Sequence, residues 1–403
     1  MILKAYRLGL IFVIGVLLSG CAVEPDHPYY KKSSETNRFD YQGNAPFSEY
    51  VKVTRTYLKK NRVFFDTSKS VEELELVAPF ELAIPDTCPK DSRRGILLVH
   101  GLSDTSFVMK DLAHELRKQC LLVRALLLPG HGTRPKDLVD IEFADWIEAV
   151  DFGVRSLRND VDQIYIAGFS LGGLLAANAL LDHKDLQGAI LIAPALGVNA
   201  PLLTWNTIWL RYFKDWVDID PQTEAPRYQS MTTNGIAQTF LMAQHFDDRL
   251  RKRIDVPVML IQSMEDIAIH PDLNLEIFEE HMQHPRSGAL VFRGRNTSVN
   301  SVPGLSLVES YLPADKIVNL SHVSIPYSPS NKLYGLNGSY KACGQHVGIV
   351  SDKQAEDCMK STANWMGELG SEDEEVFYPF QRLTFNPFFD LMAGKIEEFL
   401  RAN

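Results

Sequence analysis

The chain has 403 residues, of which 45% are hydrophobic and 23% are charged. This composition excludes an intrinsically disordered protein and a fibre, and the length suits two average domains or one large α/β domain with insertions. Asp and Glu number 51 against 41 Lys and Arg, so the formal net charge is −10 at pH 7. An acidic chain offers no basic face for phosphates, which argues against nucleic acid as a partner.

Residues 1–20 have the pattern of a secretory signal peptide. Two cations precede an uncharged apolar run at residues 8–18, which is too short to span a bilayer as a helix. The run ends in L-S-G-C at residues 18–21, and this ending resembles the signal of bacterial lipoproteins. The resemblance implies that the thiol of Cys21 is lipidated. An ordinary signal peptide, with Cys21 later in a disulfide, is the alternative.

A lipidated Cys21 would anchor the mature chain on a membrane. Each buried CH₂ group contributes about 0.8 kcal/mol, so two or more acyl chains hold a protein firmly without a transmembrane helix. In lipoproteins of this type a residue other than Asp after the cysteine implies sorting to the outer membrane, and here it is Ala22. We therefore expect a lipid-anchored protein of the bacterial cell envelope, at the outer membrane. Residues 21–50 would hold the lipidated cysteine and a tether, because residues 22–45 have no hydrophobic periodicity.

Four further cysteines would meet an oxidising compartment in an exported protein. Four cysteines allow three pairings. We favour Cys88 with Cys120 and Cys343 with Cys358, because each pair flanks a local loop. Four free thiols are the alternative.

Beyond residue 50, apolar runs alternate with helical stretches. A helix is expected at residues 51–60, followed by a half-buried hairpin of strands at 74–77 and 80–84. Later apolar runs predict parallel strands that are buried on both faces, and a closing helix begins at Asn386. The fold class is therefore α/β, with one doubly wound, mostly parallel sheet in residues 51–403. The predicted parallel strands are at 95–99, 121–128, 164–167, 189–192, 256–261 and, as the last strand, 316–320.

A G-x-S-x-G motif at residues 168–172 joins one of these strands to an apolar helix. In this arrangement the serine lies on a strained turn with its hydroxyl exposed, and the two glycines leave room where a Cβ would clash. The motif predicts that Ser170 is a nucleophile. A serine hydroxyl is a poor nucleophile until a histidine takes its proton and a carboxylate orients that histidine.

Asp266 and His322 are the residues that we select as Ser170's partners. Asp266 follows the strand at 256–261, and Glu265 is its main rival; His322 follows the strand predicted at 316–320. The 56 residues between them exceed what this order usually needs, so we expect an insertion at about 284–313, in which residues 289–292 can form a short strand. The other acids and histidines considered, expected on the surface or in loops, are Asp247, Asp248, Asp272, His270, His281, His284 and His346.

The oxyanion of a tetrahedral intermediate needs preorganised N–H donors, each typically contributing about 3 kcal/mol. We assign the backbone N–H groups of Leu102 and Leu171 to this oxyanion hole, because both follow strand ends. Gly101 lets the backbone turn close to the substrate. His100 is expected to order this loop rather than to act in the chemistry.

Three runs of sequence together resemble the monoacylglycerol-lipase and carboxylesterase branch of the α/β-hydrolases. They are L-V-H-G-L at residues 98–102, L-P-G-H-G-T-R-P at 128–135 and G-F-S-L-G-G at 168–173. The resemblance covers residues 90–322 and the final helix. It implies the α/β-hydrolase fold, a cofactor-free Ser-Asp-His mechanism on esters, and a structural role for His131. The chain departs from the family at about 284–313 and 326–385.

The segment at about 197–250 lies where this fold carries a helical cap insertion. Its apolar residues recur at spacings of three and four, as on one face of a helix. They predict either an apolar lid over an acyl pocket or a cap helix packed on the core. The residues are Leu202, Trp205, Ile208, Trp209, Tyr212, Phe213, Trp216 and Val217.

We therefore expect a membrane-anchored serine hydrolase that cleaves small-molecule or lipid carboxylic esters with an apolar acyl group. A peptidase or amidase with the same triad is an alternative. A non-catalytic lipoprotein that binds a partner at the envelope is another, and a missing triad residue would mark it. The sequence contains neither a His, Cys and Asp cluster with ligand spacing nor a nucleotide loop, so we expect no metal and no cofactor.

Overall fold

The computed structural model describes residues 26–35, 39–197, 201–250, 253–295, 297–343, 352–368 and 377–402. The expected signal peptide, Cys21 and His346 lie outside the described residues, and so does the side chain of Leu202.

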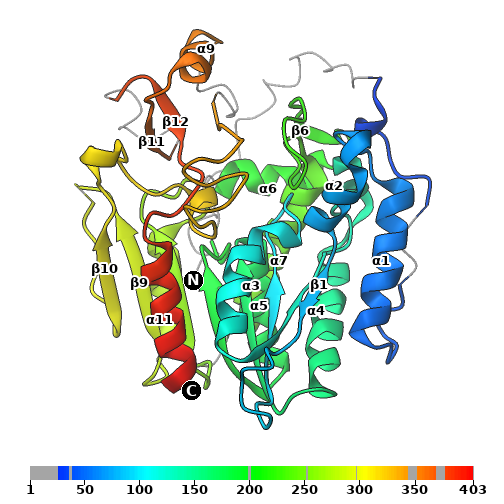
Figure 1. The fold of residues 1–403 in the computed structure, drawn as a ribbon, viewed down its shortest axis with the longest axis vertical. Coiled ribbons are helices and arrows are strands. Elements are labelled where there is room, and N and C mark those ends of the chain that lie inside the picture. The colour runs from blue at the N-terminus through cyan, green and yellow to red at the C-terminus, as the bar shows by residue number, and fades with distance from the viewer. Residues whose placement is uncertain are drawn as a thin grey trace.

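An eight-stranded sheet forms the centre of the fold (Figure 1). Its strand order is β1-β3-β2-β4-β5-β8-β9-β10, and every neighbouring pair is parallel except β1 with β3. The expected doubly wound, mostly parallel sheet is confirmed. The strands are β1 (Phe80–Leu82), β2 (Arg94–Val99), β3 (Leu121–Ala125), β4 (Gln163–Phe169), β5 (Leu186–Ile192), β8 (Val258–Ser263), β9 (Gly288–Arg293) and β10 (Leu305–Glu309).

Helices cover both faces of this sheet. The chain runs from β2 outward to β3 and then back past β2 to β4, so right-handed crossovers place α3 on one face and α4 and α5 on the other. α11 packs beside α3, and α7 packs against α4 and α5. The helices are α1 (Phe47–Asn61), α2 (Ser70–Val77), α3 (Lys110–Lys118), α4 (Phe143–Arg158), α5 (Leu171–Asp182), α7 (Thr233–Arg249), α8 (Pro271–His281) and α11 (Phe389–Ala402).

The register of the central strands brings their carboxyl ends together. Val99 of β2 pairs with Gly168 of β4, and Phe169 of β4 pairs with Ile192 of β5. In doubly wound sheets this edge carries the ligand site. The fold therefore collects the loops after β2, β4 and β5 at one end of the sheet.

The hairpin predicted at 74–77 and 80–84 is wrong in its first strand. Residues 74–77 belong to α2, and β1 pairs instead with β3 at the edge of the sheet. An alternation of four residues is too short to specify a strand, and Glu72 and Glu73 in the first turn favour a helix start. The carboxylate of Glu73 is buried and accepts the backbone N–H groups of Phe65 and Asp66.

The tether predicted at 22–45 is wrong for its described part, which packs on the domain. A 3₁₀ turn, η2 (Pro28–Tyr30), buries Tyr29 and Tyr30. Further on, the ring of Phe39 lies 5.0 Å from the ring of Tyr50 in α1. The aromatic side chains stabilise this packing because each removes a large apolar area from water.

The last strand predicted at 316–320 is also wrong. The sheet instead ends with β9 and β10, so the segment expected as an insertion at 284–313 contains two strands of the central sheet. Residues 289–292 are buried in a row, as a strand covered on both faces requires. Ile317 instead forms two isolated bridges, an antiparallel one with Leu312 and a parallel one with Met366, which lies far along the chain.

The predicted cap segment contains two helices and a short antiparallel strand pair. These are α6 (Pro201–Leu210), β6 (Trp216–Asp218), β7 (Met231–Thr232) and α7. α6 and α7 pack against each other.

We call residues 326–385, between His322 and α11, the C-terminal excursion. It contains α9 (Asp352–Lys360) and a parallel pair of β11 (Trp365–Gly367) with β12 (Phe380–Arg382). Figure 1 shows it at the same end of the sheet as α6 and β6.

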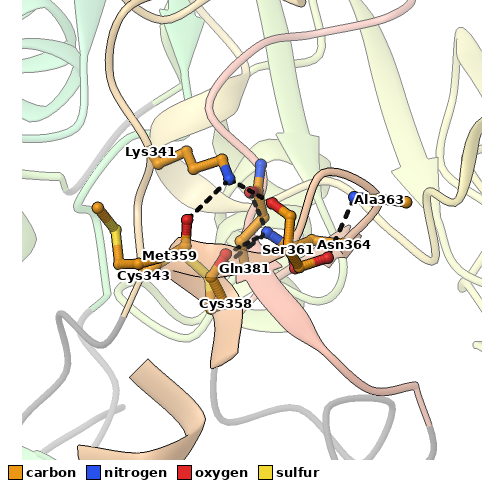
Figure 2. The surroundings of a disulfide bond; sticks show 8 residues. All are labelled: Lys341, Cys343, Cys358, Met359, Ser361, Ala363, Asn364 and Gln381. Atoms are coloured by element: carbon orange, nitrogen blue, oxygen red, sulfur yellow. Dashed lines mark hydrogen bonds between the residues drawn. A yellow bond between two sulfur atoms is a disulfide. The ribbon is translucent and has the colours of Figure 1, made fainter. Parts of the chain in front are cut away.

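Two disulfides form, and both match the pairing favoured from the sequence. Cys88 pairs with Cys120, and Cys343 pairs with Cys358 inside the C-terminal excursion. Around the second bridge, Asn364 donates hydrogen bonds to the backbone oxygen of Cys358 and to the side chain of Gln381 (Figure 2). The bridge therefore joins the start of the excursion to α9, next to the β11–β12 pair.

Candidate active site

Ser170 lies on the tight turn between β4 and α5. Its φ of +55° is in the left-handed region, which few residues other than glycine adopt without strain. A Cβ on Gly168 would lie 2.0 Å from the backbone oxygen of Gly172, and a Cβ on Gly172 would lie 2.1 Å from that of Val99. Both positions therefore require glycine, and the turn presents Ser170 at the carboxyl end of the sheet.

His322 and Asp266 complete a hydrogen-bonded chain with Ser170. The Nε2 atom of His322 lies 3.0 Å from the Oγ atom of Ser170, and its Nδ1 atom lies 2.5 Å from Oδ2 of Asp266. An ionised carboxylate only accepts, so Nδ1 donates to Asp266 and Nε2 accepts the hydroxyl proton of Ser170. The other oxygen of Asp266 accepts the backbone N–H groups of Ala268 and Ile269. The structure thus brings together the three residues selected from the sequence.

Glu265, the main rival of Asp266, points away from His322. Its carboxylate accepts the hydroxyl of Ser263 at 3.1 Å and the backbone N–H of Gly294 at 2.7 Å. It therefore ties the end of β8 to the loop after β9. The other rivals belong to α7, α8 or the turn after α8: Asp247, Asp248, His270 at the N-cap of α8, Asp272, His281 and His284.

Two buried histidines hold the loop of Leu102, one of the two residues predicted for the oxyanion hole. Nε2 of His100 accepts the backbone N–H of Leu128 at 2.9 Å, and Nε2 of His131 accepts that of Ser103 at 3.2 Å. Burial lowers the pKa of His131 to about 4 and that of His100 well below its ordinary value. Both rings are therefore neutral at pH 7 and act as loop supports. The second predicted donor, Leu171, begins α5, where the N–H has no intrahelical acceptor.

Glu368 is a site residue that the sequence reasoning missed. Its carboxylate is fully buried and accepts the backbone N–H of His322 at 2.7 Å. It also forms an ion pair with Arg382, whose Nε atom lies 2.8 Å away. Burial raises the pKa of Glu368, although Arg382 opposes the shift. Glu368 lies 46 residues from His322 in the sequence, so no local pattern could have indicated the contact.

A cavity of about 600 Å³ opens beside Ser170 and His322. The cap, the loops after the strands and the C-terminal excursion all contribute to its walls. One part of the lining is apolar: Leu102, Met231, Ile236, Ile267, Ile269 and Val323. Another part is polar: Asp104, Asp218, Asp220, Arg227, Tyr340 and Arg382.

Buried charges distinguish the polar wall of this cavity. Burial raises the pKa of Asp104, against the opposing effect of Arg227 and His322. Burial also raises the pKa of the neighbouring Glu224 to about 7. The Nε atom of Arg227 is buried without a hydrogen-bond partner among the described residues. The wall therefore holds polar groups that a substrate can contact.

The aromatic residues of the cap agree only in part with the sequence interpretations. Trp216 packs in the core, as expected for a packed cap. Trp209 and Phe213, in contrast, are 60% and 88% exposed, so they neither pack on the core nor close the pocket.

The chain is similar in sequence to known hydrolases. A family model described as "Serine aminopeptidase, S33" matches residues 90–218. The thermostable monoacylglycerol lipase of Bacillus sp. (strain H-257) is 29% identical over 182 residues, which are 44% of this chain and 72% of that protein. The chain has the α/β-hydrolase fold.

Solved α/β-hydrolase structures are similar over about half of the chain. One such structure comes from work on two metagenome-derived lipolytic enzymes, LipS and LipT. It is 22% identical, and the match covers 54% of this chain and 87% of that chain with a TM-score of 0.47. The monoacylglycerol lipase of Paleococcus ferrophilus is 18% identical, covers 58% and 90%, and has a TM-score of 0.45.

In the described ranges, no helix is both long and apolar enough to cross a bilayer. Among the same residues, no group of three or more His, Cys, Asp and Glu side chains could hold a metal ion.

Proposed function

We propose that this chain is a serine hydrolase that cleaves carboxylic esters through an acyl-enzyme. The observation that carries the proposal is the chain of hydrogen bonds from Ser170 through His322 to Asp266, which borders a cavity of about 600 Å³. The similarity to a monoacylglycerol lipase supports an ester as the substrate.

In the proposed mechanism, His322 takes the hydroxyl proton of Ser170 while Oγ attacks the ester carbonyl carbon. The backbone N–H groups of Leu102 and Leu171 stabilise the oxyanion, and Asp266 stabilises the imidazolium. His322 then protonates the leaving alcohol. In the second half a water molecule, deprotonated by His322, attacks the acyl-enzyme and releases the acid.

We also propose an apolar acyl group, since one wall of the cavity is built from aliphatic side chains. The proposed location is the outer membrane, with the lipid anchor on Cys21. The support for this location is the L-S-G-C sequence at residues 18–21 and Ala22 after it.

A peptidase or amidase is the second candidate, because the matching family model is described as a serine aminopeptidase. The same three residues cleave amides when His322 can protonate the leaving amine. A non-catalytic envelope-binding protein is less well supported, because no member of the hydrogen-bonded chain is missing.

The test is labelling of the full chain with a fluorophosphonate probe, followed by turnover of a chain-length series of p-nitrophenyl esters and the matching p-nitroanilides. We expect labelling and ester turnover in the wild type and neither in Ser170→Ala. Ser92→Ala is the matched control, because its hydroxyl only donates to the backbone of Cys120. Faster turnover of the anilides would favour the amidase, and a folded wild type that is not labelled would exclude a serine hydrolase.

A further inference from the structure

Arg227 lies on the wall of the cavity with its positive charge unpaired. Its guanidinium forms neither a hydrogen bond nor an ion pair with any described residue, and its Nε atom is buried. The second arginine of the wall, Arg382, has an ion pair with the buried Glu368. A buried charge without a partner is costly, so Arg227, unlike Arg382, gains free energy by binding an anion.

Two hydrogen bonds hold the backbone on either side of Arg227 against the loop after β2. The hydroxyl of Thr105 donates to the backbone oxygen of Pro226 at 2.8 Å. The backbone N–H of Tyr228 donates to the backbone oxygen of Ser103, also at 2.8 Å. The backbone of Arg227 is therefore fixed beside the loop that carries a proposed oxyanion donor, close to where the ester is cleaved.

The acids around the cavity do not form an ion pair with Arg227. Asp104 and Glu224 attract its charge, but within the described ranges neither carboxylate is close enough for an ion pair. Burial raises the pKa of Glu224 to about 7, so this acid is only partly ionised at neutral pH. Burial and then the neighbouring Asp218 raise the pKa of Asp220 to about 6, and Arg227 has no part in that shift. An anionic ligand would therefore supply the contact that these acids do not make.

The lining of the cavity offers different walls to the two halves of an ester. Aliphatic side chains such as Ile267 and Ile269 belong to the wall proposed above for the acyl group. Arg227 belongs to the polar wall, together with Tyr327 and Tyr340 of the C-terminal excursion. The polar wall is thus the one left for the alcohol part of the substrate.

We propose that Arg227 binds an anionic group, a carboxylate or a phosphate, on the alcohol part of the ester substrate. The inference rests on the proposed ester hydrolysis and narrows its substrate class to esters of anionic alcohols. A guanidinium presents its N–H donors as a planar fork, which matches two oxygens of such a group. When the ester is cleaved, His322 protonates the leaving alkoxide, and the anionic group departs with the released alcohol.

Two pairs of soluble esters, each differing by one anionic group, test the proposal on the full chain. The first pair is phenyl acetate and 4-carboxyphenyl acetate, and the second is 1-butyrylglycerol and its 3-phosphate. We expect the wild type to have a roughly ten- to hundredfold higher kcat/KM for the anionic member of at least one pair, mainly through a lower KM. The pair with the larger ratio identifies the group as carboxylate or phosphate. An equal or lower kcat/KM for the anionic member in both pairs would overturn the proposal.

Arg227→Gln tests whether Arg227 causes this preference. We expect the ratio of kcat/KM between the anionic and the neutral ester to fall close to one. Arg227→Lys should recover part of the ratio, because lysine keeps the charge but not the fork. Arg249→Gln is the matched control and should keep the wild-type ratio, because Arg249 also belongs to the cap but pairs with Asp182. A purely structural role of Arg227 would lower kcat/KM for both esters equally, and that unchanged ratio would refute the inference.

Binding to Ser170→Ala separates this inference from the proposed function. Titration calorimetry on this variant compares the affinities of 1-butyrylglycerol 3-phosphate and 1-butyrylglycerol, and of the two phenyl esters, without turnover. We expect tighter binding of the anionic member and loss of the difference in Ser170→Ala/Arg227→Gln. Equal binding within both pairs would contradict the role given to Arg227. A wild type inactive on all four esters would refute the hydrolase, and the binding comparison would still decide the role of Arg227.

Discussion

The Oγ atom of Ser170 lies 3.0 Å from the Nε2 atom of His322, yet the two residues are supported by different kinds of structure. Ser170 is held by its own motif, because Gly168 and Gly172 lie within two residues of it and a Cβ on either would clash with backbone atoms. His322 is held by the C-terminal excursion. Its backbone N–H donates to Glu368, and the neighbouring Ser321 donates to the backbone oxygen of Leu383.

The proposed nucleophile is therefore supported by residues close to it in the sequence, and the proposed base is supported by distant ones. The matching family model ends at residue 218, so it includes Ser170 but neither His322 nor Asp266. The segment that supports His322 lies later still, in residues 326–385. The structure that supports Ser170 and the structure that supports His322 therefore lie in different parts of the chain.

The largest effect is expected from Gly172→Ala on the nucleophile side. The new Cβ would lie 2.1 Å from the backbone oxygen of Val99, and neither backbone can move away without breaking the pairing of β2 with β4. We expect loss of fluorophosphonate labelling and a destabilisation of at least about 3 kcal/mol in urea unfolding. Gly394→Ala on α11 is the control, because its Cβ meets nothing within 4 Å and should stabilise by roughly 1 kcal/mol. Normal labelling of Gly172→Ala would show that the turn at Ser170, between β4 and α5, is not rigid.

Glu368→Ala tests the histidine side. It removes the acceptor of the His322 N–H and leaves the guanidinium of Arg382 unpaired in a buried site. Breaking a buried ion pair in this way typically costs about 3–5 kcal/mol, measured by urea unfolding. We also expect kcat to fall in the folded fraction while KM changes little, because His322 is displaced and the cavity remains.

Glu368→Gln distinguishes an effect of Glu368 on His322 from an effect on the stability of the fold alone. The amide oxygen still accepts the N–H of His322, but the negative charge near the imidazole is lost; the other acids close to that ring are Asp266 and Asp104. The neutral imidazole is then favoured, so the acidic limb of the kcat/KM profile should move to lower pH. A variant that loses stability without moving this limb would show that Glu368 is only structural.

The sequence predicts the features that depend on nearby residues better than those that depend on distant contacts. Five strands of the central sheet, β2, β3, β4, β5 and β8, and the turn at Ser170 were predictable, because buried parallel strands are continuous apolar runs and G-x-S-x-G is a local geometric requirement. Asp266 and His322 were selected from chain order. His322 was selected for a partly wrong reason, since the strand expected at 316–320 does not join the sheet.

The parts that the sequence analysis missed depend on distant contacts. The segment at 316–320 bridges the nearby Leu312 and the distant Met366 and does not join the sheet, and no local pattern encodes the contact with Met366. Tyr29 and Tyr30 looked like part of a tether because their partners, Trp216 and Tyr228, belong to the cap. Glu368 belongs to no recognisable motif, and its role depends on the distant His322 and on Arg382.

The two disulfides test the same contrast, because only the bridge from Cys343 to Cys358 lies in the C-terminal excursion that supports His322. The bridge from Cys343 to Cys358 spans 15 residues and that from Cys88 to Cys120 spans 32, so removing either should cost roughly 3 to 4 kcal/mol in urea unfolding. We expect only Cys343→Ser/Cys358→Ser to lower kcat, because Ala342 beside it lines the cavity and accepts the N–H of Arg382. An equal loss of kcat in Cys88→Ser/Cys120→Ser would mean that the excursion has no special link to the site.

A smaller effect is expected from Glu224, a second buried acid near the cavity. Glu368 has a guanidinium at 2.8 Å, whereas the Oε2 atom of Glu224 is buried without a hydrogen-bond partner among the described residues. Burial raises the pKa of Glu224 from 4.5 to about 7. Between these two values the folded protein binds a proton that the unfolded chain has released, so unfolding gives up a proton and stability falls as the pH rises.

Glu224→Gln removes this pH dependence while keeping the size of the side chain. We expect the variant and the wild type to be similar near pH 4.5, and the variant to be more stable above pH 7 by an amount on the order of 2 kcal/mol. Urea unfolding at both pH values measures the difference, and the exposed Glu276→Gln should show none. A wild type that gains stability relative to Glu224→Gln as the pH rises would mean that Arg227 pairs with the ionised Glu224. The cap would then hold its acid as the C-terminal excursion holds Glu368, and the contrast between the two acids would disappear.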